Sequence, residues 1–371
     1  MHRRLAPALA LALLVLVGAP AEARQGWTAT SIAWLSSGDD GTFLEPRAMC
    51  DDTGFLGAAW IERHAQWSRA GVTLRTERGW TVTTFPPAPA ILGIAATAGR
   101  TDAPAVAWGE SAGAFVARLV RGAWVVDRLV DGPVRVLDLT SCGGGRLACL
   151  LALGNGPEGL AVARGRSGVW VIEPLPMPDR APRLGPGRIV AGPDGRPRAL
   201  VLLDEDGRGR MVRYERLAGG WTATSLPAIL GAAAEGRFGL AADARGNLQA
   251  AFMGQDSRRL FIADLDDANP TPTEPDPGCS LRYPQVDLAL DGDGIPHVVY
   301  FAVTPDGGLQ IRLARRSDGT WTSSMVDRTM SKNSLATLSL ALTGDGRPYL
   351  SYALGPARAV LLAWPKPDGR R

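Results

Sequence analysis

Six charged residues recur at two fixed distances before a turn residue, usually glycine, in a repeated sequence pattern. Four lie seven residues before it and two lie nine residues before it; the six are Arg47, Asp138, Arg188 and Asp287, and Glu45 and Arg237. Guanidinium and carboxylate groups on one narrow ring could orient a polar ligand. The alternative is that these charges pair between adjacent repeat units, as Asp138 and Arg188 could, because a buried charge must be paired.

Other arrangements that carry chemistry are missing from the sequence. His64 and His297 are the only histidines after residue 23, and neither lies near a nucleophile-elbow pattern. No glycine-rich phosphate loop occurs. The Asp-Gly turns at 204–207 and 291–294 lack the spaced oxygen ligands of a calcium loop, so we interpret them as hairpin turns. We therefore predict no catalytic residue, no metal and no cofactor.

The four cysteines raise the question of disulfides. They are Cys50, Cys142, Cys149 and Cys279, an even number, which in an oxidising compartment favours pairing. Cys142 and Cys149 flank three glycines in a predicted hairpin, and we predict that they form a disulfide. Pairing of Cys50 with Cys279 stays open. Zinc ligation is not expected, because the spacings do not fit a zinc motif.

Two repeated columns of residues define the elements that hold these side chains. A Gly-Trp or Gly-x-Trp step opens a stretch of alternating β-formers six times, with its tryptophan at 27, 80, 124, 170, 221 and 321. A turn residue is followed six positions later by a large apolar residue seven times. These turn residues are Gly54, Asp102, Gly145, Gly195, Gly246, Gly294 and Gly346. The sequence therefore contains seven units with a period of about 49 residues.

Each unit is predicted to contain four short strands joined by tight hairpins, and no segment shows sustained helical periodicity. Seven such units predict an all-β fold, a seven-bladed β-propeller over residues 24–371, with a parallel β-helix or two sandwiches as alternatives. The first strand of each unit would line the central channel. Its residues alternate between an apolar face and a face of polar or small side chains, which places the six charged residues in the channel.

The two ends of the repeat region match one another. The last unit ends at 361–369 after its third strand, and Gly26-Trp27-Thr28-Ala29-Thr30 is a fourth strand with no unit before it. The N-terminal strand is thus predicted to complete the last blade, which would leave no exposed sheet edge at the junction.

The aromatic columns have two interpretations, a sugar-stacking surface or packing between blades. We favour packing, because a bulky residue at one register in nearly every unit is what repeated sheet-to-sheet contacts need. Trp34, Trp67 and Trp364 lie outside both columns and are the tryptophans to inspect for ligand contact.

Residues 1–23 resemble a secretory signal peptide, with arginines at 3 and 4, an apolar run from Leu5 to Val17 and small residues before Ala23. We expect export to the periplasm or the medium. The whole chain carries a formal net charge of +3, which favours neither nucleic acid nor an anionic membrane surface as a partner. We expect a monomer with no inserted membrane segment after signal cleavage.

The repeat Asp291-Gly-Asp-Gly-Ile-Pro-His-Val-Val-Tyr300, followed by Gly319-Thr320-Trp321, resembles the repeats of secreted bacterial propellers related to sialidases and Asp-box (BNR) proteins. The segment Ser317–Trp321 is similar to a shortened Asp-box. The resemblance implies an arginine triad, for which Arg47, Arg188, Arg237 and Arg282 are candidates, and a nucleophilic tyrosine, for which Tyr283 is a candidate. The Phe/Tyr-Arg-Ile-Pro motif of sialidases is absent, so no catalytic residue is transferred.

The sequence leads to one functional hypothesis and two alternatives. The first is a non-enzymatic binding or interaction module outside the cytoplasm, with an unknown protein or glycan as ligand. The alternatives are a sialidase-like enzyme acting on glycans, which needs two neighbouring carboxylates in one funnel, and a lectin, which needs arginine, glutamate and tryptophan around equivalent surface pockets.

Overall fold

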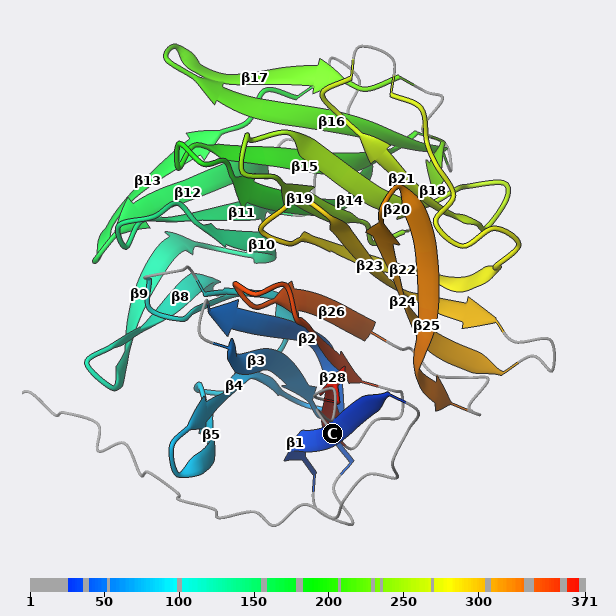
Figure 1. Ribbon diagram of the computed structural model, residues 1–371. Helices are drawn as coiled ribbons and strands as arrows, with labels where there is room; N and C mark the ends of the chain where they lie inside the picture. Colours follow the sequence, from blue (N-terminus) through cyan, green and yellow to red (C-terminus); the bar gives the residue numbers. More distant parts are fainter. Residues whose placement is uncertain are drawn as a thin grey trace, which may run out of the picture.

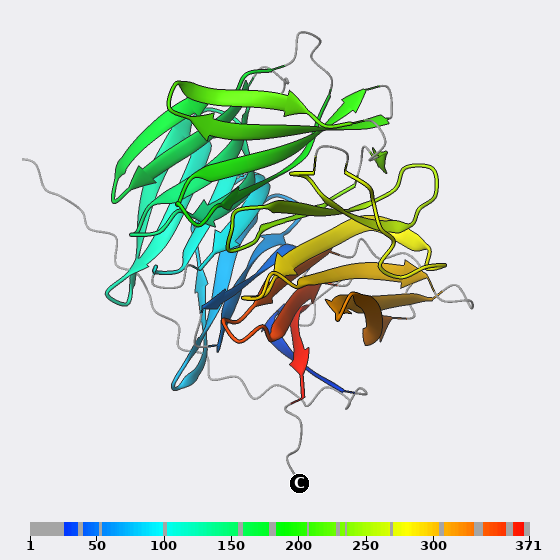
Figure 2. The same ribbon diagram turned by 45° about the horizontal axis from the view of Figure 1, so that its top comes forward.

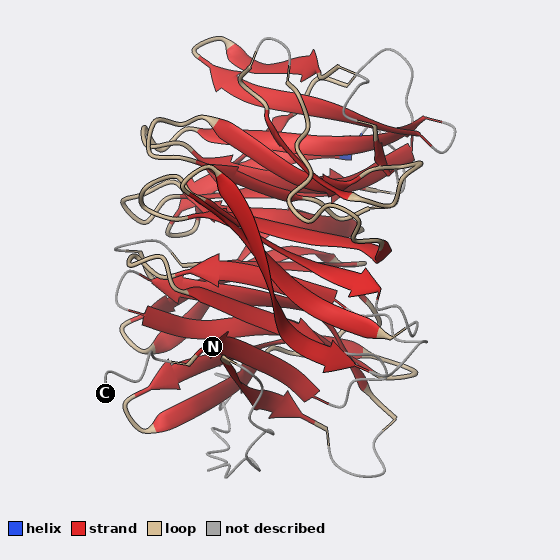
Figure 3. Cartoon of the chain, turned by 45° about the vertical axis from the view of Figure 1, so that its right-hand side comes forward, coloured by secondary structure: helices blue, strands red, loops and turns tan. Residues whose placement is uncertain are grey.

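The computed structural model describes residues 26–35, 40–51, 54–98, 102–154, 159–177, 183–205, 208–227, 231–233, 236–267, 270–303, 308–329, 337–353 and 359–366. Most of them form β-strands (Figure 3). The strands belong to seven separate antiparallel sheets set around a common centre (Figures 1 and 2). The predicted seven-bladed propeller is confirmed. The predicted signal peptide, residues 1–23, lies outside the described residues.

Each blade runs from an inner to an outer strand in chain order. Blade 1 contains β2 (Thr42–Asp51), β3 (Gly54–Arg63), β4 (Ser68–Thr76) and β5 (Gly79–Thr84), and blade 2 contains β6 (Ile91–Thr97), β7 (Ala105–Glu110), β8 (Gly113–Val120) and β9 (Ala123–Asp131). Blade 3 contains β10 (Val134–Ser141), β11 (Leu147–Leu153), β12 (Leu160–Arg166) and β13 (Val169–Pro174). Blade 4 contains β14 (Arg183–Ala191), β15 (Pro197–Glu205), β16 (Arg208–Leu217) and β17 (Gly220–Ser225), with the short β18 (Ala232–Ala233) paired to β16.

The remaining three blades complete the ring. Blade 5 contains β19 (Gly239–Ala242), β20 (Leu248–Met253) and β21 (Leu260–Asp264), and blade 6 contains β22 (Leu281–Leu290), β23 (Pro296–Val303), β24 (Leu309–Ser317) and β25 (Thr320–Thr329). Blade 7 contains β26 (Thr337–Leu342), β27 (Pro348–Ala353), β28 (Ala359–Pro365) and β1 (Trp27–Trp34). No helix within these described elements and their connections has the length and apolar character needed to cross a bilayer.

The glycine column marks the turn between the first and second strand of a blade. All six glycines in this column, at 54, 145, 195, 246, 294 and 346, have a positive φ between 70° and 146°. Side chains disfavour this region, so glycine is the residue that makes the turn without strain. Asp102 occupies the same place in blade 2, and its carboxylate accepts a hydrogen bond from the Gly145 backbone N–H at 2.7 Å. The seventh turn is thus tied to the next blade by a side chain.

The hydrophobic core is divided among the contacts between blades. The described residues form seven buried clusters, and each joins two adjacent blades, including blade 7 to blade 1. The residues six positions after the turn column are at most 4% exposed, among them Trp60, Trp108, Phe252, Tyr300 and Tyr352. Their burial supports the packing interpretation of this column and explains the period, since every blade must fill the space against its neighbour.

The ring closes as the matched ends predicted. β1 pairs with β28 along its whole length, from Trp27 opposite Pro365 to Trp34 opposite Ala359. In Figure 1 the two strands lie side by side beside the C-terminal end of the described chain. The Lys366 N–H donates to the Gly26 carbonyl at 2.9 Å and extends the ladder by one bond. The last blade is therefore built from both ends of the chain.

Blade 5 departs from the pattern at the place where the Gly-Trp step is missing. Its fourth strand is reduced to a single β-bridge between Ile262 and Thr273, with reciprocal backbone hydrogen bonds of 2.9 and 2.8 Å. The segment near residue 270 lacks alternating β-formers. It thus lies where an outer strand would lie but pairs with β21 at one residue, Thr273.

The disulfide predicted between Cys142 and Cys149 is not formed, and all four cysteines are free thiols. Cys149 lies opposite Leu139 in the β10–β11 hairpin, and Cys142 is three residues beyond Leu139. Because side chains alternate between the faces of a sheet, the two thiols point to opposite sides of blade 3. Cys149 packs in the cluster shared with blade 2, and Cys142 packs in the cluster shared with blade 4.

Candidate functional site

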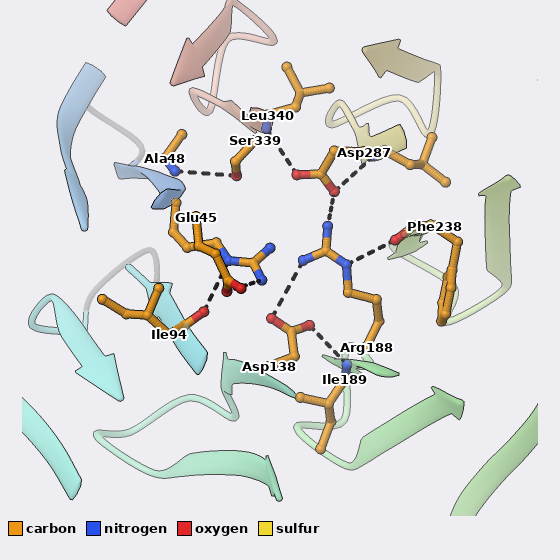
Figure 4. Close-up of polar contacts among 12 residues, drawn as sticks. Glu45, Ala48, Ile94, Asp138, Arg188, Ile189, Phe238, Asp287, Ser339 and Leu340 are labelled. Atoms are coloured by element: carbon orange, nitrogen blue, oxygen red, sulfur yellow. Dashed lines mark hydrogen bonds and ion pairs between the residues drawn. The ribbon is translucent and has the colours of Figure 1, made fainter. Parts of the chain in front are cut away.

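The six charged residues singled out in the sequence surround the centre of the ring. The inner strands β2, β6, β10, β14, β19, β22 and β26 line the axis, as expected from the repeat. Asp138, Arg188 and Asp287 meet there (Figure 4). Arg47 lies near Arg188 and Asp138. Glu45 lies at the same level as Arg237, which is two residues before the start of β19.

The residue seven positions before the turn fastens each polar inner strand to the next blade. Carboxylate or hydroxyl groups accept hydrogen bonds from a backbone N–H of that blade: Asp138 from Ile189 at 3.0 Å, Asp287 from Leu340 at 3.0 Å and Ser339 from Ala48 at 3.2 Å. The arginines instead donate to a backbone carbonyl: Arg47 to Ile94 at 3.1 Å and Arg188 to Phe238 at 3.0 Å. This layer of the ring has a structural role, as the pairing interpretation predicted.

Arg188 also joins three blades through its charge. It forms ion pairs with Asp138 of blade 3 at 3.6 Å and with Asp287 of blade 6 (Figure 4). The contact with blade 6 skips blade 5, where Gly239 occupies the equivalent position and presents no side chain. Burial acts to lower the pKa of Arg188, but Asp287 and Asp138 outweigh burial and raise it. The three residues form a buried bridge across the channel.

A cavity of about 450 Å³ opens above this bridge, on the face where the inner strands begin. Its charged lining comprises five arginines and two carboxylates, namely Arg47, Arg135, Arg183, Arg188 and Arg237, and Glu45 and Asp204. Arg188 is already engaged by two aspartates, so the other four arginines face two carboxylates. With Asp138 and Asp287 counted, the five arginines face four carboxylates, so the mouth of the channel and the bridge beneath it carry an excess of one positive charge.

Glu45 and Arg237 form an ion pair of 2.7 Å that spans the mouth from blade 1 to blade 5. The second terminal nitrogen of Arg237, Nη1, is buried and has no hydrogen-bond partner among the described residues. Glu45 has a φ of 51° at a bulge in β2, and it precedes Pro46, which disfavours helical backbone conformations at Glu45. A positive φ at a residue other than glycine costs about 1–3 kcal/mol and persists only where the surrounding structure stabilises it. At this bulge the Glu45 carboxylate lines the cavity and reaches Arg237.

The charges in the mouth shift the pKa of one another. Burial, followed by the neighbouring Arg237 and Arg188, lowers the pKa of Arg47 to about 10. Burial acts to raise the pKa of Glu45, but Arg237 and Arg47 together outweigh burial, so that the net pKa is lowered. Burial also lowers the pKa of Arg135. An added anion would relieve the repulsion between these guanidinium groups.

Arg135, Arg183 and Asp204 belong to the cavity although the sequence columns did not select them. Five of the seven inner strands, β2, β6, β10, β14 and β22, have a register shift near their start. Each bulge changes which side chains face the channel, and Arg135 lies just before the shift in β10. A count continued to ten and twelve residues before the turn would have reached Arg135 and Arg183. The side chains of Arg282 and Tyr283 lie outside the described part.

An arrangement of arginine, acid and tryptophan recurs on the outer strands, but its polar groups bind one another. The Asp127 carboxylate accepts from Arg118 at 2.6 Å and from the Trp170 indole at 3.3 Å. One blade further, Glu173 accepts from Arg164, from Arg216 and, at 2.8 Å, from the Trp221 indole. These groups fasten adjacent blades together.

The three tryptophans outside the columns do not join the channel. Trp67 stacks on His64 with a centroid distance of 3.8 Å, and Trp364 lies 6.4 Å from the ring of Tyr349. Trp34 is 37% exposed at the end of β1.

The hydrogen-bonded group of Glu173 with Arg164, Arg216 and Trp221, called the outer latch below, gives a prediction about stability in acid. Hydrogen bonds from Arg164, Arg216 and Trp221 outweigh the opposing effect of burial and lower the pKa of Glu173 to about 2 from its ordinary 4.5. The stability that Glu173 provides is therefore complete above pH 4.5 and is lost as the pH falls toward 2. We expect Glu173→Gln to cost about 1–2 kcal/mol at pH 7. Urea unfolding of both proteins between pH 7 and pH 2.5 tests this; a gap that stays constant with pH would exclude the latch.

The fold and the channel define the protein as a β-propeller with a charged central site. No protein-family model matches the chain, and no curated protein matches it significantly in sequence. A protein of unknown function from Dyadobacter fermentans is similar in structure, with a TM-score of 0.54, 12% identity, and 92% of this chain and 100% of that chain covered. The Hadza microbial sialidase Hz136 gives 0.52, 14% identity, and 87% and 66% coverage.

A variant of AofleA from Arthrobotrys oligospora with three arginines replaced by alanine gives a TM-score of 0.51, 16% identity, and 83% and 90% coverage. At these identities the likeness shows the propeller fold alone. The resemblance to sialidase-like propellers is thus confirmed at the level of the fold, and this chain spans 66% of the length of the sialidase.

Proposed function

We propose that this protein is a binding propeller, exported from the cytoplasm, that holds a small anionic ligand in the mouth of its central channel. The observation that carries the proposal is the set of five guanidinium groups around a cavity of about 450 Å³, which outnumber the four carboxylates in and beneath it. The buried Nη1 of Arg237, which has no hydrogen-bond partner in the described part of the chain, adds a donor that a ligand oxygen would satisfy.

Binding is favoured over glycan hydrolysis by the state of the carboxylates. Glu45 is held by Arg237, and Asp138 and Asp287 are held by Arg188. A general acid needs a raised pKa, whereas Arg237 and Arg47 lower that of Glu45. The channel is accordingly suited to orient charge rather than to transfer protons.

The central channel is also favoured over sugar sites between blades. A second cavity of about 330 Å³ lies between blades 3 and 4 and includes Arg146, Arg164 and the exposed Val169. Arg164 of this lining is already engaged by the Glu173 carboxylate, which also accepts from Arg216 and Trp221.

Thermal unfolding in the presence of sugar acids, dicarboxylates and matched neutral sugars tests the proposal. At about 100 times its Kd a ligand stabilises by about 2.7 kcal/mol, or roughly 5 °C in Tm. We expect this shift for anions only, and we expect Arg237→Met to abolish it. Arg347→Ala is the control, because Arg347 carries the same charge at an exposed turn outside the cavity. Equal shifts by neutral sugars, or an unchanged shift with Arg237→Met, would refute the site.

A further inference from the structure

Glu45 occupies the strongest anion-binding position in the cavity. Its carboxylate is the described group that contacts Arg237, at 2.7 Å, and it lies 3.9 Å from Arg47. Charge-assisted bonds of this kind are short and specific for carboxylate-like oxygens. The side chains of Glu45 and Arg237 are 26% and 24% exposed, so the pair is reached from the open side of the cavity. The protein thus presents its own carboxylate where a ligand's would bind.

We propose that the ligand is a small dianion and that one of its anionic groups displaces Glu45 from Arg237; the proposal rests on the channel mouth being the binding site. Once displaced, Glu45 keeps a partner, because Arg47 already lies 3.9 Å from it. The two anionic groups of the ligand would then contact two of the arginines that the Arg188 bridge does not use.

Arg135 is placed to receive the second anionic group. One of its terminal nitrogens, Nη2, donates to the Leu184 and Gly185 carbonyls, both at 3.3 Å, which holds the guanidinium at the wall of the cavity. Arg135 and Arg237 line the same cavity, and burial first, then repulsion by Arg237, lowers the pKa of Arg135. A dianion that bridges them would replace this repulsion with two attractive contacts.

Calorimetry at low ionic strength with succinate, succinamate and succinamide tests the charge, because these molecules have nearly the same shape and carry charges of −2, −1 and 0. We expect affinity for the unaltered protein to rise with each charge. Sulfate is the tetrahedral dianion in the comparison. Tighter binding of succinate assigns the site to dicarboxylates, and tighter binding of sulfate assigns it to tetrahedral oxyanions. Affinities that do not depend on charge would overturn the proposal.

Glu45→Gln tests the displacement. Removing the resident carboxylate should raise the affinity for succinate or sulfate by about 10- to 100-fold, the scale of one hydrogen bond to a charged group. Glu274→Gln is the matched control, because Glu274 pairs with Arg259 at 3.1 Å outside the cavity. If Glu45→Gln leaves affinity unchanged while Arg237→Met abolishes binding, displacement is wrong and the channel site stands. If Arg237→Met binds normally, the proposed function itself fails.

Discussion

A chain that begins at Asp40, and therefore lacks β1, is expected to lose most of its stability. β1 contributes Trp27, Ile32 and Ala33 to the core, at 6%, 2% and 5% exposure. Burial of a tryptophan or isoleucine side chain is worth about 1.5–3 kcal/mol, and the hydrogen bonds to β28 add about 0.5–1.5 kcal/mol each. Their sum is comparable to the 5–15 kcal/mol of a typical domain. The loss is severe because β1 belongs to two interfaces, those of blade 7 with blades 6 and 1.

Urea unfolding followed by circular dichroism measures this loss against the chain that begins at residue 24. A peptide of residues 24–35 added to the truncated chain should restore part of the stability in proportion to its concentration, since a ligand of the folded state stabilises by mass action. A scrambled peptide of the same composition should not. A truncated chain that unfolds within about 1 kcal/mol of the parent would show that β1 does not close the ring.

The fold was predictable because each blade repeats the same physical requirement. A turn that needs a positive φ fixes a glycine, as at Gly195 and Gly346, and a gap between two sheets fixes a large side chain, as at Trp60 and Tyr352. Seven repetitions of both signals make their period visible even though each signal alone is weak. The short outer strand of blade 5 agrees with this explanation, because the one unit that lacks the Gly-Trp step forms only a single bridge there, at Thr273.

The site was predictable only in part, because a period-two count does not anticipate bulges. The two sequence columns predicted the residues of the Arg188 bridge and of the ion pair across the mouth. They did not predict Arg135, which lies just before the register shift in β10 and lines the cavity. Pairing of Arg188 with Asp138 was foreseen, since their blades are adjacent. Pairing with Asp287 was not, because it depends on the missing side chain of Gly239 and on the reach of an arginine across the channel.

The Cys142–Cys149 prediction was wrong for a related reason. The two cysteines are close in the hairpin, but the alternation of side chains along the strands places their thiols in different interfaces between blades. Burial raises the pKa of the Cys142 thiol to about 11 and raises that of Cys149 as well. Both thiols therefore act as small core residues in this fold.

Asp287→Ala is expected to be among the most damaging single substitutions in the channel. The Asp287 carboxylate, in a residue only 6% exposed, accepts from Arg188, from its neighbour Leu288 at 3.1 Å and from Leu340 at 3.0 Å. Its removal leaves the buried Arg188 short of one counter-charge and the Leu340 N–H without its side-chain acceptor. Removing one partner of a buried ion pair typically costs about 3–5 kcal/mol. Asp345→Ala, at an exposed turn beside Arg347, should cost under about 1 kcal/mol.

A double-mutant cycle separates the charge from the other contacts of Asp287. Arg188→Met removes the guanidinium but keeps an apolar stem of similar length, so the pair Arg188→Met and Asp287→Ala leaves no unpaired charge between these two positions. We expect the double variant to be at least about 1 kcal/mol more stable in urea unfolding than the sum of the single losses predicts, because both single variants lose the same attraction and Arg188→Met also leaves the buried Asp287 without its guanidinium partner. Strictly additive losses would mean that Arg188 and Asp287 stabilise the ring independently. The losses would then come from the separate contacts of each residue with its next blade, Arg188 with the Phe238 carbonyl and Asp287 with the Leu340 N–H.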